Sequence, residues 1–287
     1  MSVPIRDAAT VLALREDESR LEVFMVRRDS RLGFLGGAHV FPGGAVDDGD
    51  RTEAAHTLLI GIDEMGAMER LHDDPAQARA LLIAAIRELF EEAGILLARD
   101  ARGRWVDLSG GGERAARLLE ARKASSEGRG GFVEAMRGEG LSLDVSGFRY
   151  FAHWITPDRE KKRFDTRFFL ARAPEGQLAE HCAVESSAGE WITPARALER
   201  YHLREIELVP PTIATLESLA KFATVDDALE AFLSAPIPRI LPKITMYEET
   251  ITILYPGDAD YEPGQASDPA GRACNRLVLR DGLWHRP

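Results

Sequence analysis

Residues 87–95 read Arg-Glu-Leu-Phe-Glu-Glu-Ala-Gly-Ile. This stretch closes a helix that should begin near Asp74, because Asp is a favoured N-cap and Pro75 suits the first helical position. Gly94 stands where helices commonly end in the left-handed conformation. Apolar residues recur between these ends at the spacing of a buried stripe: Ala78, Leu81, Leu82, Ala85, Leu89 and Ala93. The sequence therefore predicts a long buried helix that ends at Gly94.

Three carboxylates crowd the last turns of this helix. Glu88, Glu91 and Glu92 are related by three and four positions, so they share one helix face. Such pairs are each destabilising by roughly 0.2–0.5 kcal/mol, and acidic groups near a helix C-terminus also oppose the helix dipole. A bound cation would relieve this repulsion, and hard oxygen ligands favour Mg²⁺ or Mn²⁺ over zinc. A solvated acidic face is the alternative interpretation of the three glutamates taken alone.

The neighbours of this cluster favour the metal interpretation. Arg87 lies four residues before Glu91 and can hold a carboxylate through two hydrogen bonds. Upstream, residues 41–44 read Phe-Pro-Gly-Gly, and the two glycines allow a loop whose backbone approaches other groups closely. A free carbonyl of that loop could complete the coordination shell of a cation.

These residues resemble the two halves of the Nudix box. The family writes the second half R-E-U-x-E-E-x-G-U, with U a bulky aliphatic residue, and residues 87–95 match every specified position. The first half of the family pattern is a glycine followed, six positions later, by a glutamate. Residues 44–50 resemble it, but Asp50 stands in place of the glutamate. The halves are separated by 36 residues, 51–86, where seven are usual.

A long insertion in the box is typical of the Nudix hydrolase 19-like branch, the coenzyme A diphosphatases. Residues 153–157 (His-Trp-Ile-Thr-Pro) and 163–169 (Arg-Phe-Asp-Thr-Arg-Phe-Phe) also resemble segments of that branch. The resemblance implies an α+β Nudix fold, a mixed sheet sandwiched between helices. We expect a Nudix domain over residues 1–235, with an insertion at about 51–73 that forms a separate small unit on one rim. Residues 236–287 should form a C-terminal extension packed on the domain.

The resemblance also implies roles for five residues. Glu88, Glu91 and Glu92 match the positions that bind the metal, and Gly43 matches the glycine whose carbonyl joins the coordination. Arg87 matches the arginine that orients a glutamate. Arg87, Glu88, Glu91 and Glu92 are therefore the expected catalytic residues, with Mg²⁺ or Mn²⁺ as cofactor. Metal ions would neutralise a diphosphate, hold it in line and acidify an attacking water.

The implied reaction is hydrolysis of a diphosphate in a nucleoside-diphosphate-linked compound. Coenzyme A or an acyl-coenzyme A is the first candidate, and ADP-ribose or another nucleotide conjugate is the alternative. One of the glutamates, or Glu185 from a later loop, could take the proton from water. Two other classes stay open at this point: a noncatalytic Nudix-fold nucleotide sensor, and a structural protein whose acidic helix is only solvated. Metal titration with a phosphate-release assay separates the three classes.

Substrate contacts are sought among charged residues near apolar segments. Arg28 follows a predicted strand, and Arg163 and Arg167 belong to a predicted strand hairpin, so each could hold a phosphate. Glu185 could contact the substrate near a further short strand at residues 190–192. Solvation at the surface is the alternative for all four.

The other elements follow from periodicity and turn residues. Residues 9–14 and 21–26 should form a hairpin, and residues 148–155 and 164–171 should form two more strands. Further helices are expected at residues 113–123, 132–137, 194–200 and 211–222, and further strands at residues 251–255 and 275–279.

The bulk properties bound the class of protein. A net charge of −11 argues against nonspecific binding to nucleic acid or to an anionic membrane, so a small anionic substrate would need local cations. The longest apolar runs are too short to span a bilayer, and the N-terminus lacks the apolar stretch of a signal peptide. Cys182 and Cys274 are isolated, which indicates neither a disulfide framework nor a zinc site. We expect a cytoplasmic enzyme, and a homodimer is compatible with the family.

Overall fold

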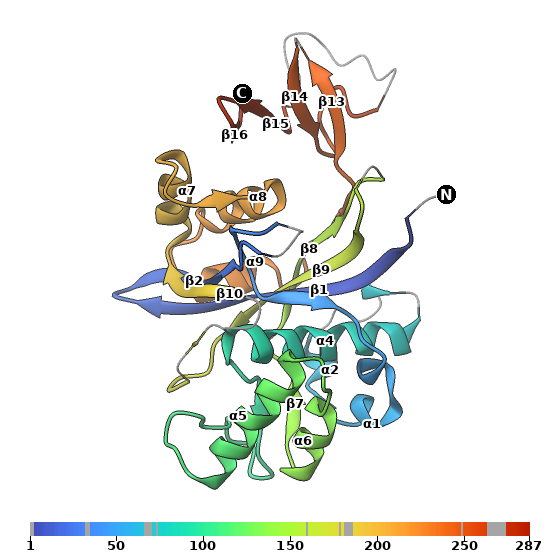
Figure 1. The fold of residues 1–287 in the computed structure, drawn as a ribbon, viewed down its shortest axis with the longest axis vertical. Coiled ribbons are helices and arrows are strands. Elements are labelled where there is room, and N and C mark those ends of the chain that lie inside the picture. The colour runs from blue at the N-terminus through green and yellow to red at the C-terminus, as the bar shows by residue number, and fades with distance from the viewer. Residues whose placement is uncertain are drawn as a thin grey trace.

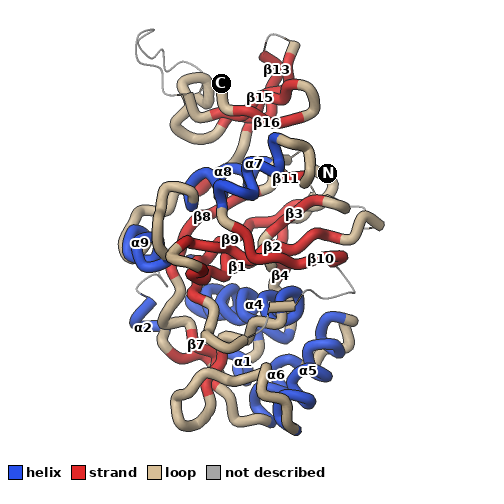
Figure 2. Tube along the Cα trace, turned by 90° about the vertical axis from the view of Figure 1, so that its left-hand side faces the viewer, coloured by secondary structure: helices blue, strands red, loops and turns tan. Residues whose placement is uncertain are grey.

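The computed structural model describes residues 3–31, 35–65, 71–72, 74–158, 160–177, 179–180, 186–247, 249–262 and 274–287. Within this part, a mixed main sheet lies between two layers of helices (Figures 1 and 2). The strand order is β11 (Glu207–Leu208), β3 (Ala38–Val40), β2 (Arg20–Arg28), β1 (Ile5–Asp17), β9 (Arg163–Arg172), β8 (Arg149–Ile155) and β12 (Arg239–Ile240). In addition, β4 (Gly43–Ala45) pairs with β1, and β10 (Ser186–Ile192) pairs with β2. The expected α+β architecture is confirmed.

The central strand β1 is buried on both faces. It pairs antiparallel with β2 and parallel with β9, in a register that sets Ala9 opposite Arg167 and Thr10 opposite Phe168. Successive side chains of a strand point to opposite faces. One face of β1 therefore packs with Ala9 and Val11 into the core around α4 (Pro75–Ala93), and the other packs with Leu12 and Leu14 into a second core. Along β1 and β9, odd-numbered and even-numbered side chains therefore point to opposite faces of the sheet.

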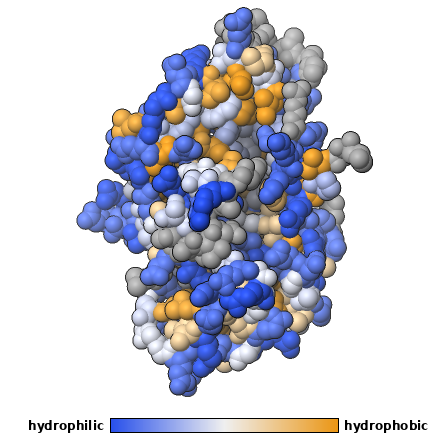
Figure 3. Space-filling view, viewed as in Figure 1, coloured by the Kyte–Doolittle hydropathy of each residue, from blue (hydrophilic) through white to orange (hydrophobic). Residues whose placement is uncertain are grey.

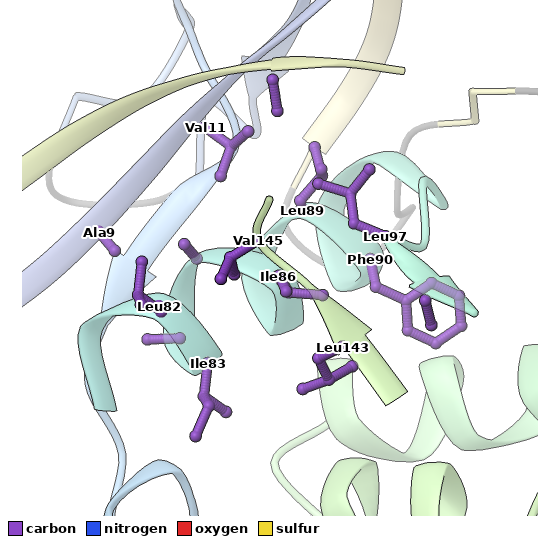
Figure 4. Packing of buried hydrophobic residues seen from close by; sticks show 14 of the residues in the cluster. Ala9, Val11, Leu82, Ile83, Ile86, Leu89, Phe90, Leu97, Leu143 and Val145 are labelled. Atoms are coloured by element: carbon purple, nitrogen blue, oxygen red, sulfur yellow. The ribbon is translucent and has the colours of Figure 1, made fainter. Parts of the chain in front are cut away.

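Helix α4 is formed by the capping residues that the sequence indicated. The Asp74 side chain accepts a hydrogen bond from the backbone N–H of Ala76, and Gly94 adopts φ 69° in the left-handed region. Figure 4 shows α4 between two strands. On one side lies β1 with Ala9 and Val11, and on the other lies β7 (Ser142–Asp144) with Leu143. Because apolar side chains cover α4 on both sides, the helix is held firmly in place. The carboxylates at its end are therefore carried on a rigid support.

The two helical layers differ in size. Below the main sheet in Figure 1, α4 is joined by α5 (Glu113–Ser126), α6 (Phe132–Gly138) and a small sheet of β5 (Leu59–Ile60), β7 (Ser142–Asp144) and β6 (Ala98–Arg99). Above it lie α7 (Pro194–His202), α8 (Pro210–Leu219) and α9 (Val225–Ala231). The expected helices and strand hairpins are confirmed, whereas α9 was not predicted. No helix in the described ranges combines the length and apolarity needed to cross a membrane.

The segment inside the box is part of the core and not a separate unit. It contains η1 (Gly49–Arg51), α1 (Glu53–His56), β5 and α2 (Ile62–Met65). Ala55, Leu58, Leu59 and Leu71 are buried in the same hydrophobic cluster as α4. Arg167 also donates a hydrogen bond from Nε to the Leu71 carbonyl at 3.0 Å. The expectation of an independent decoration was wrong, because the segment's apolar residues cover one side of α4.

Leu71→Ala should therefore destabilise the whole fold. Leu71 is 1% exposed, and truncating such a residue typically costs about 2–5 kcal/mol. Urea unfolding measures the change, with Ile60→Ala as a matched control because Ile60 lies in the same insertion but is 39% exposed. A loss below about 1 kcal/mol for Leu71→Ala would contradict the integration of the insertion into the core.

The C-terminal residues form a second antiparallel sheet against the upper layer. Its order is β13 (Lys243–Tyr247), β14 (Thr250–Leu254), β15 (Arg276–Arg280) and β16 (Leu283–His285). Tyr255 meets Trp154 of β8 edge to face at 5.5 Å, and the Trp284 backbone N–H donates to the Tyr201 hydroxyl at 2.6 Å. The main sheet itself continues past residue 235, since β12 pairs with β8. The extension thus packs onto β8 and α7.

Candidate functional site

Arg87 is the hub of a buried network at the end of α4. Its Nε and Nη2 donate to the two carboxylate oxygens of Asp50 at 3.0 and 2.9 Å. Its Nη1 donates to Glu88 at 2.8 Å and to Glu91 at 3.2 Å. Burial alone would lower the pKa of Arg87, but the surrounding carboxylates of Glu88, Asp50 and Glu91 outweigh burial and hold this pKa well above its ordinary value. Arg87 is a permanent cation that orients three carboxylates.

Asp50 is the residue that departs from the usual box. Its side chain is fully buried, and besides Arg87 it accepts a hydrogen bond from the backbone N–H of Asp47 at 2.9 Å. The short helix η1 brings Asp50 close to α4, so the shorter aspartate reaches both guanidinium nitrogens. Arg87 therefore makes two hydrogen bonds to Asp50 but only one to Glu91.

The glycines of residues 43 and 44 permit close contact with the acidic helix end. The Gly43 backbone N–H donates to a Glu92 carboxylate oxygen at 3.0 Å. A Cβ on Gly44 would lie 2.4 Å from Glu88 Oε1, and a Cβ on Gly43 would lie 2.5 Å from the Ala9 carbonyl oxygen. Any larger residue would displace the carboxylates or break the pairing of β4 with β1. The loop and the helix end are thus built as one unit.

Glu91 is held by hydrogen bonds on both of its carboxylate oxygens. One oxygen accepts from Ser125 at the end of α5, and the other accepts from Arg87. Burial raises the pKa of Glu91, although Arg87 and Ser125 act in the opposite direction. A buried carboxylate whose charged form is disfavoured would gain from an additional cation nearby.

The donor set at this site suits a hard divalent cation. Glu88, Glu91 and Gly43 line one cavity, and all of their potential ligand atoms are oxygens. As the side chains stand in the described residues, no three carboxylate, histidine or cysteine groups are arranged to hold an ion. Glu88 and Glu91 each direct an oxygen at Arg87, and Glu92 directs one at the Gly43 N–H. Metal binding would therefore require these carboxylates to turn toward the cavity.

The cavity has a volume of about 880 Å³ and joins surfaces of different character. Small-molecule sites typically measure roughly 300–1,000 Å³, so this one suits a large ligand. Its lining includes the acidic residues Glu88 and Glu91 and the cations Arg6 and Arg28. It also includes a set of apolar residues: Trp154, Phe164, Phe168, Pro210, Ile244 and Ile253.

Of the four residues expected to contact substrate, Arg28 lies in this cavity. Its Nε is buried and has no hydrogen-bond partner among the described residues, which leaves a donor available in the residue that lines the cavity. Glu185 lies outside the described residues.

The other two expected contacts, Arg163 and Arg167, do not line the cavity. Arg167 points to the α4 face of β9, where it binds the Leu71 carbonyl and the carboxylate of Asp165. Arg163 has the same parity and pairs with Asp158 at 2.5 Å. The even-numbered residues of β9, such as Phe164 and Phe168, face the cavity instead. Strand alternation therefore removes Arg163 and Arg167 from the site.

Some cavity residues were missed by the sequence reasoning. Arg6 shares the parity of Ala8 and Thr10 on β1, and all three line the cavity. The sequence shows this alternation along β1, but it does not show which face of β1 borders a cavity. Ser125, in the last turn of α5, and Gly128, two residues after the end of α5, also line the cavity.

Comparison with known proteins places this geometry in a family. Residues 68–219, more than half of the chain, match the family model for the NUDT19 Nudix domain. The chain is similar to the acyl-coenzyme A diphosphatase NUDT19 of Gallus gallus, at 31% identity over 92% of this chain and 81% of the relative. It is 28% identical to the Homo sapiens protein of the same name, over 83% of this chain and 72% of the relative. Among solved structures, a NUDIX hydrolase from Alicyclobacillus acidocaldarius aligns with a TM-score of 0.60 and 30% identity, covering 82% of this chain and 99% of the other.

Proposed function

Because the chain belongs to the Nudix hydrolases of the NUDT19 branch, we propose that it hydrolyses the diphosphate of coenzyme A and its acyl thioesters. The products would be 3',5'-ADP and a phosphopantetheine or its acyl derivative. Family membership makes the chain an enzyme, so the noncatalytic sensor and the purely structural protein are set aside. The substrate proposal rests on one observation: a single cavity is lined by the glutamates at the end of α4, by Arg6 and Arg28, and by a set of apolar residues.

The residues at the end of α4 would hold and orient the reacting groups. Glu88, Glu91, Glu92 and the Gly43 carbonyl are the proposed ligands of Mg²⁺ or Mn²⁺, the ions that hard oxygen ligands favour. When bound, such ions neutralise the diphosphate and acidify the attacking water. Arg87 holds Glu88 and Glu91 in position. A carboxylate, one of these glutamates or Glu185, takes the proton as water oxygen attacks phosphorus and the bridging phosphorus–oxygen bond breaks.

Arg6 and Arg28 are the proposed phosphate contacts. The net charge of −11 repels an anionic substrate, so local cations must offset this field. Both arginines line the same cavity as Glu88, and the unpartnered Nε of Arg28 can donate to a phosphate oxygen. Coenzyme A carries a 3'-phosphate in addition to the diphosphate, and therefore gains more from two cations than ADP-ribose does.

Three finer expectations remain part of this proposal. We propose a cytoplasmic location, a homodimer and the absence of a nucleic-acid partner. The negative net charge supports the last of these, because phosphate backbones are repelled by it.

The deciding experiment compares coenzyme A, 3'-dephospho-coenzyme A and ADP-ribose as substrates in Mg²⁺ or Mn²⁺. Coenzyme A should give 3',5'-ADP with the highest kcat/KM, and removal of the metal by a chelator should abolish turnover. Arg28→Ala should lower kcat/KM for coenzyme A about tenfold or more, as loss of a charged hydrogen bond implies. Arg163→Ala is the matched control and should change it less than about twofold. Equal turnover of the two compounds without the 3'-phosphate, unaffected by Arg28→Ala, would leave only the general nucleotide-diphosphate hydrolase.

A further inference from the structure

Helix α5 presents one of its faces to the acidic end of α4. Four residues of that face follow one another at helical spacing: Ala115, Leu118, Arg122 and Ser125. Leu118 is fully buried in the same hydrophobic cluster as α4. Figure 3 shows many hydrophilic side chains on the lower part of this view, where Figure 1 places α5. The buried half of the face thus fixes α5 against the core and sets the direction of Arg122 and Ser125.

These two residues of α5 both contact Glu91. The Ser125 hydroxyl donates to Glu91 Oε1, and Arg122 Nε donates to the Glu91 carbonyl oxygen at 3.1 Å. The last carbonyls of a helix lack partners within the helix, and a cation near them also interacts favourably with the helix dipole. Arg122 therefore holds the backbone of Glu91, while Ser125 holds its carboxylate.

Ser125 and Arg87 hold the Glu91 carboxylate from two sides. Ser125 donates to Oε1, and Arg87 Nη1 donates to Oε2 at 3.2 Å. Each carboxylate oxygen can accept more than one bond, so Glu91 can keep both donors and still bind a cation. Ordering a glutamate side chain costs conformational entropy, and donors that have already ordered it remove this cost from metal binding. Ser125 also lines the cavity, so it holds Glu91 at the cavity wall.

The next residue of α5 shows that this contact is specific to Ser125. The Ser126 hydroxyl donates to the Arg122 carbonyl oxygen of the same helix at 2.9 Å, which is a common bond for a helical serine. The Ser125 hydroxyl instead crosses to α4. Two adjacent serines thus differ in their partners, one within α5 and one at the proposed metal site.

We propose that Ser125 is a positioning residue for metal binding by Glu91. The inference rests on the proposed function, since it takes Glu91 to be a metal ligand, and it assigns a role to a helix that lies outside the Nudix box. Ser125 acts on the reaction through Glu91. Its loss therefore weakens metal binding, while coenzyme A binds the metal-saturated enzyme as before.

The test measures the Mn²⁺ dissociation constant by titration calorimetry in the absence of substrate. Ser125→Ala should raise this constant about tenfold or more, as loss of a hydrogen bond to a charged group implies. Ser125→Cys should behave in the same way, because a thiol of similar shape is a weak donor. Ser125→Thr keeps the hydroxyl and should restore the wild-type constant to within about threefold. Ser126→Ala is the matched control, and its constant should stay within about twofold of wild type.

Kinetics of coenzyme A hydrolysis give a second measurement. The Mn²⁺ concentration for half-maximal activity should rise in Ser125→Ala and Ser125→Cys, in the same order as the dissociation constants. At saturating Mn²⁺, the KM for coenzyme A should change less than about twofold, because the lost contact is to a metal ligand and not to the substrate. A general loss of structure would instead change the KM and lower the melting temperature together.

The outcomes distinguish the two proposals. A wild type that binds no Mn²⁺ and hydrolyses no coenzyme A compound would overturn the proposed function. If the wild type binds Mn²⁺ and hydrolyses coenzyme A, an unchanged Mn²⁺ constant in Ser125→Ala and Ser125→Cys would overturn the role of Ser125 alone. An equal rise in Ser126→Ala, or a rise that Ser125→Thr does not reverse, would also overturn it, because the effect would not come from the Ser125 hydroxyl.

Discussion

Glu91→Gln is expected to lower kcat by more than about tenfold, an increase in barrier above roughly 1.4 kcal/mol, without loss of folding stability. The substitution keeps the shape of the side chain and removes the charge proposed to bind the metal. Burial already disfavours the charged form of Glu91, so a neutral group is accommodated at this position. Arg87 retains its hydrogen bonds to Asp50 and Glu88. Repulsion among the glutamates decreases, and the melting temperature should hold or rise.

Three measurements check this expectation: kcat for coenzyme A, the melting temperature, and Mg²⁺ or Mn²⁺ affinity by titration calorimetry. Glu120→Gln is the matched control, because it removes one carboxylate from the exposed side of α5. It should leave all three quantities unchanged. A Glu91→Gln protein that keeps more than about a tenth of the wild-type kcat would refute the metal-site assignment at Glu91.

Asp50→Asn should destabilise the fold strongly. Asp50 is fully buried, and its two carboxylate oxygens accept hydrogen bonds from Arg87 Nε and Nη2 at 3.0 and 2.9 Å. Removing one partner of a buried ion pair costs about 3–5 kcal/mol. An asparagine amide group can accept through only one oxygen, so we expect about 3 kcal/mol. For a protein of this size, that corresponds to a fall in melting temperature of roughly 6–12 °C.

Asp47→Asn gives a close comparison in thermal unfolding experiments. The Asp47 carboxylate lies 3.8 Å from the same guanidinium group, but its side chain is 61% exposed. Solvent-exposed ion pairs contribute about 0–1 kcal/mol, so this variant should unfold near the wild-type temperature. Similar melting temperatures for Asp50→Asn and Asp47→Asn would show that Asp50 does not anchor Arg87.

The part of the site that lies within one helix was predictable from sequence. Capping residues, the apolar repeat and the spacing of Glu88, Glu91 and Glu92 all act over a few residues, so their consequences follow from helix geometry alone. The hairpin of β1 and β2 was predictable for the same reason. The family resemblance, carried by the same short stretch, also indicated the fold and the branch, which the comparisons confirmed.

Contacts between distant segments were decided by the tertiary structure. That Asp50 is the main partner of Arg87 depends on how the insertion folds between them. Whether Arg28 or Arg167 lines the cavity depends on which face of the sheet borders that cavity. Both faces of this sheet are apolar and buried, so the sequence pattern does not distinguish them. A pattern of alternation predicts two faces but does not say which one a ligand meets.

The acidic helix end, its capping and the chemistry of its oxygen ligands thus follow from the local sequence, because they depend on neighbours three and four residues apart. The folded structure was needed to show that the insertion belongs to the core, and that Arg6, Arg28, Ile244 and Ile253 line the same cavity as Glu88 and Glu91. Those relations join residues far apart in the chain. They arise from packing against a shared hydrophobic core, which no local pattern encodes.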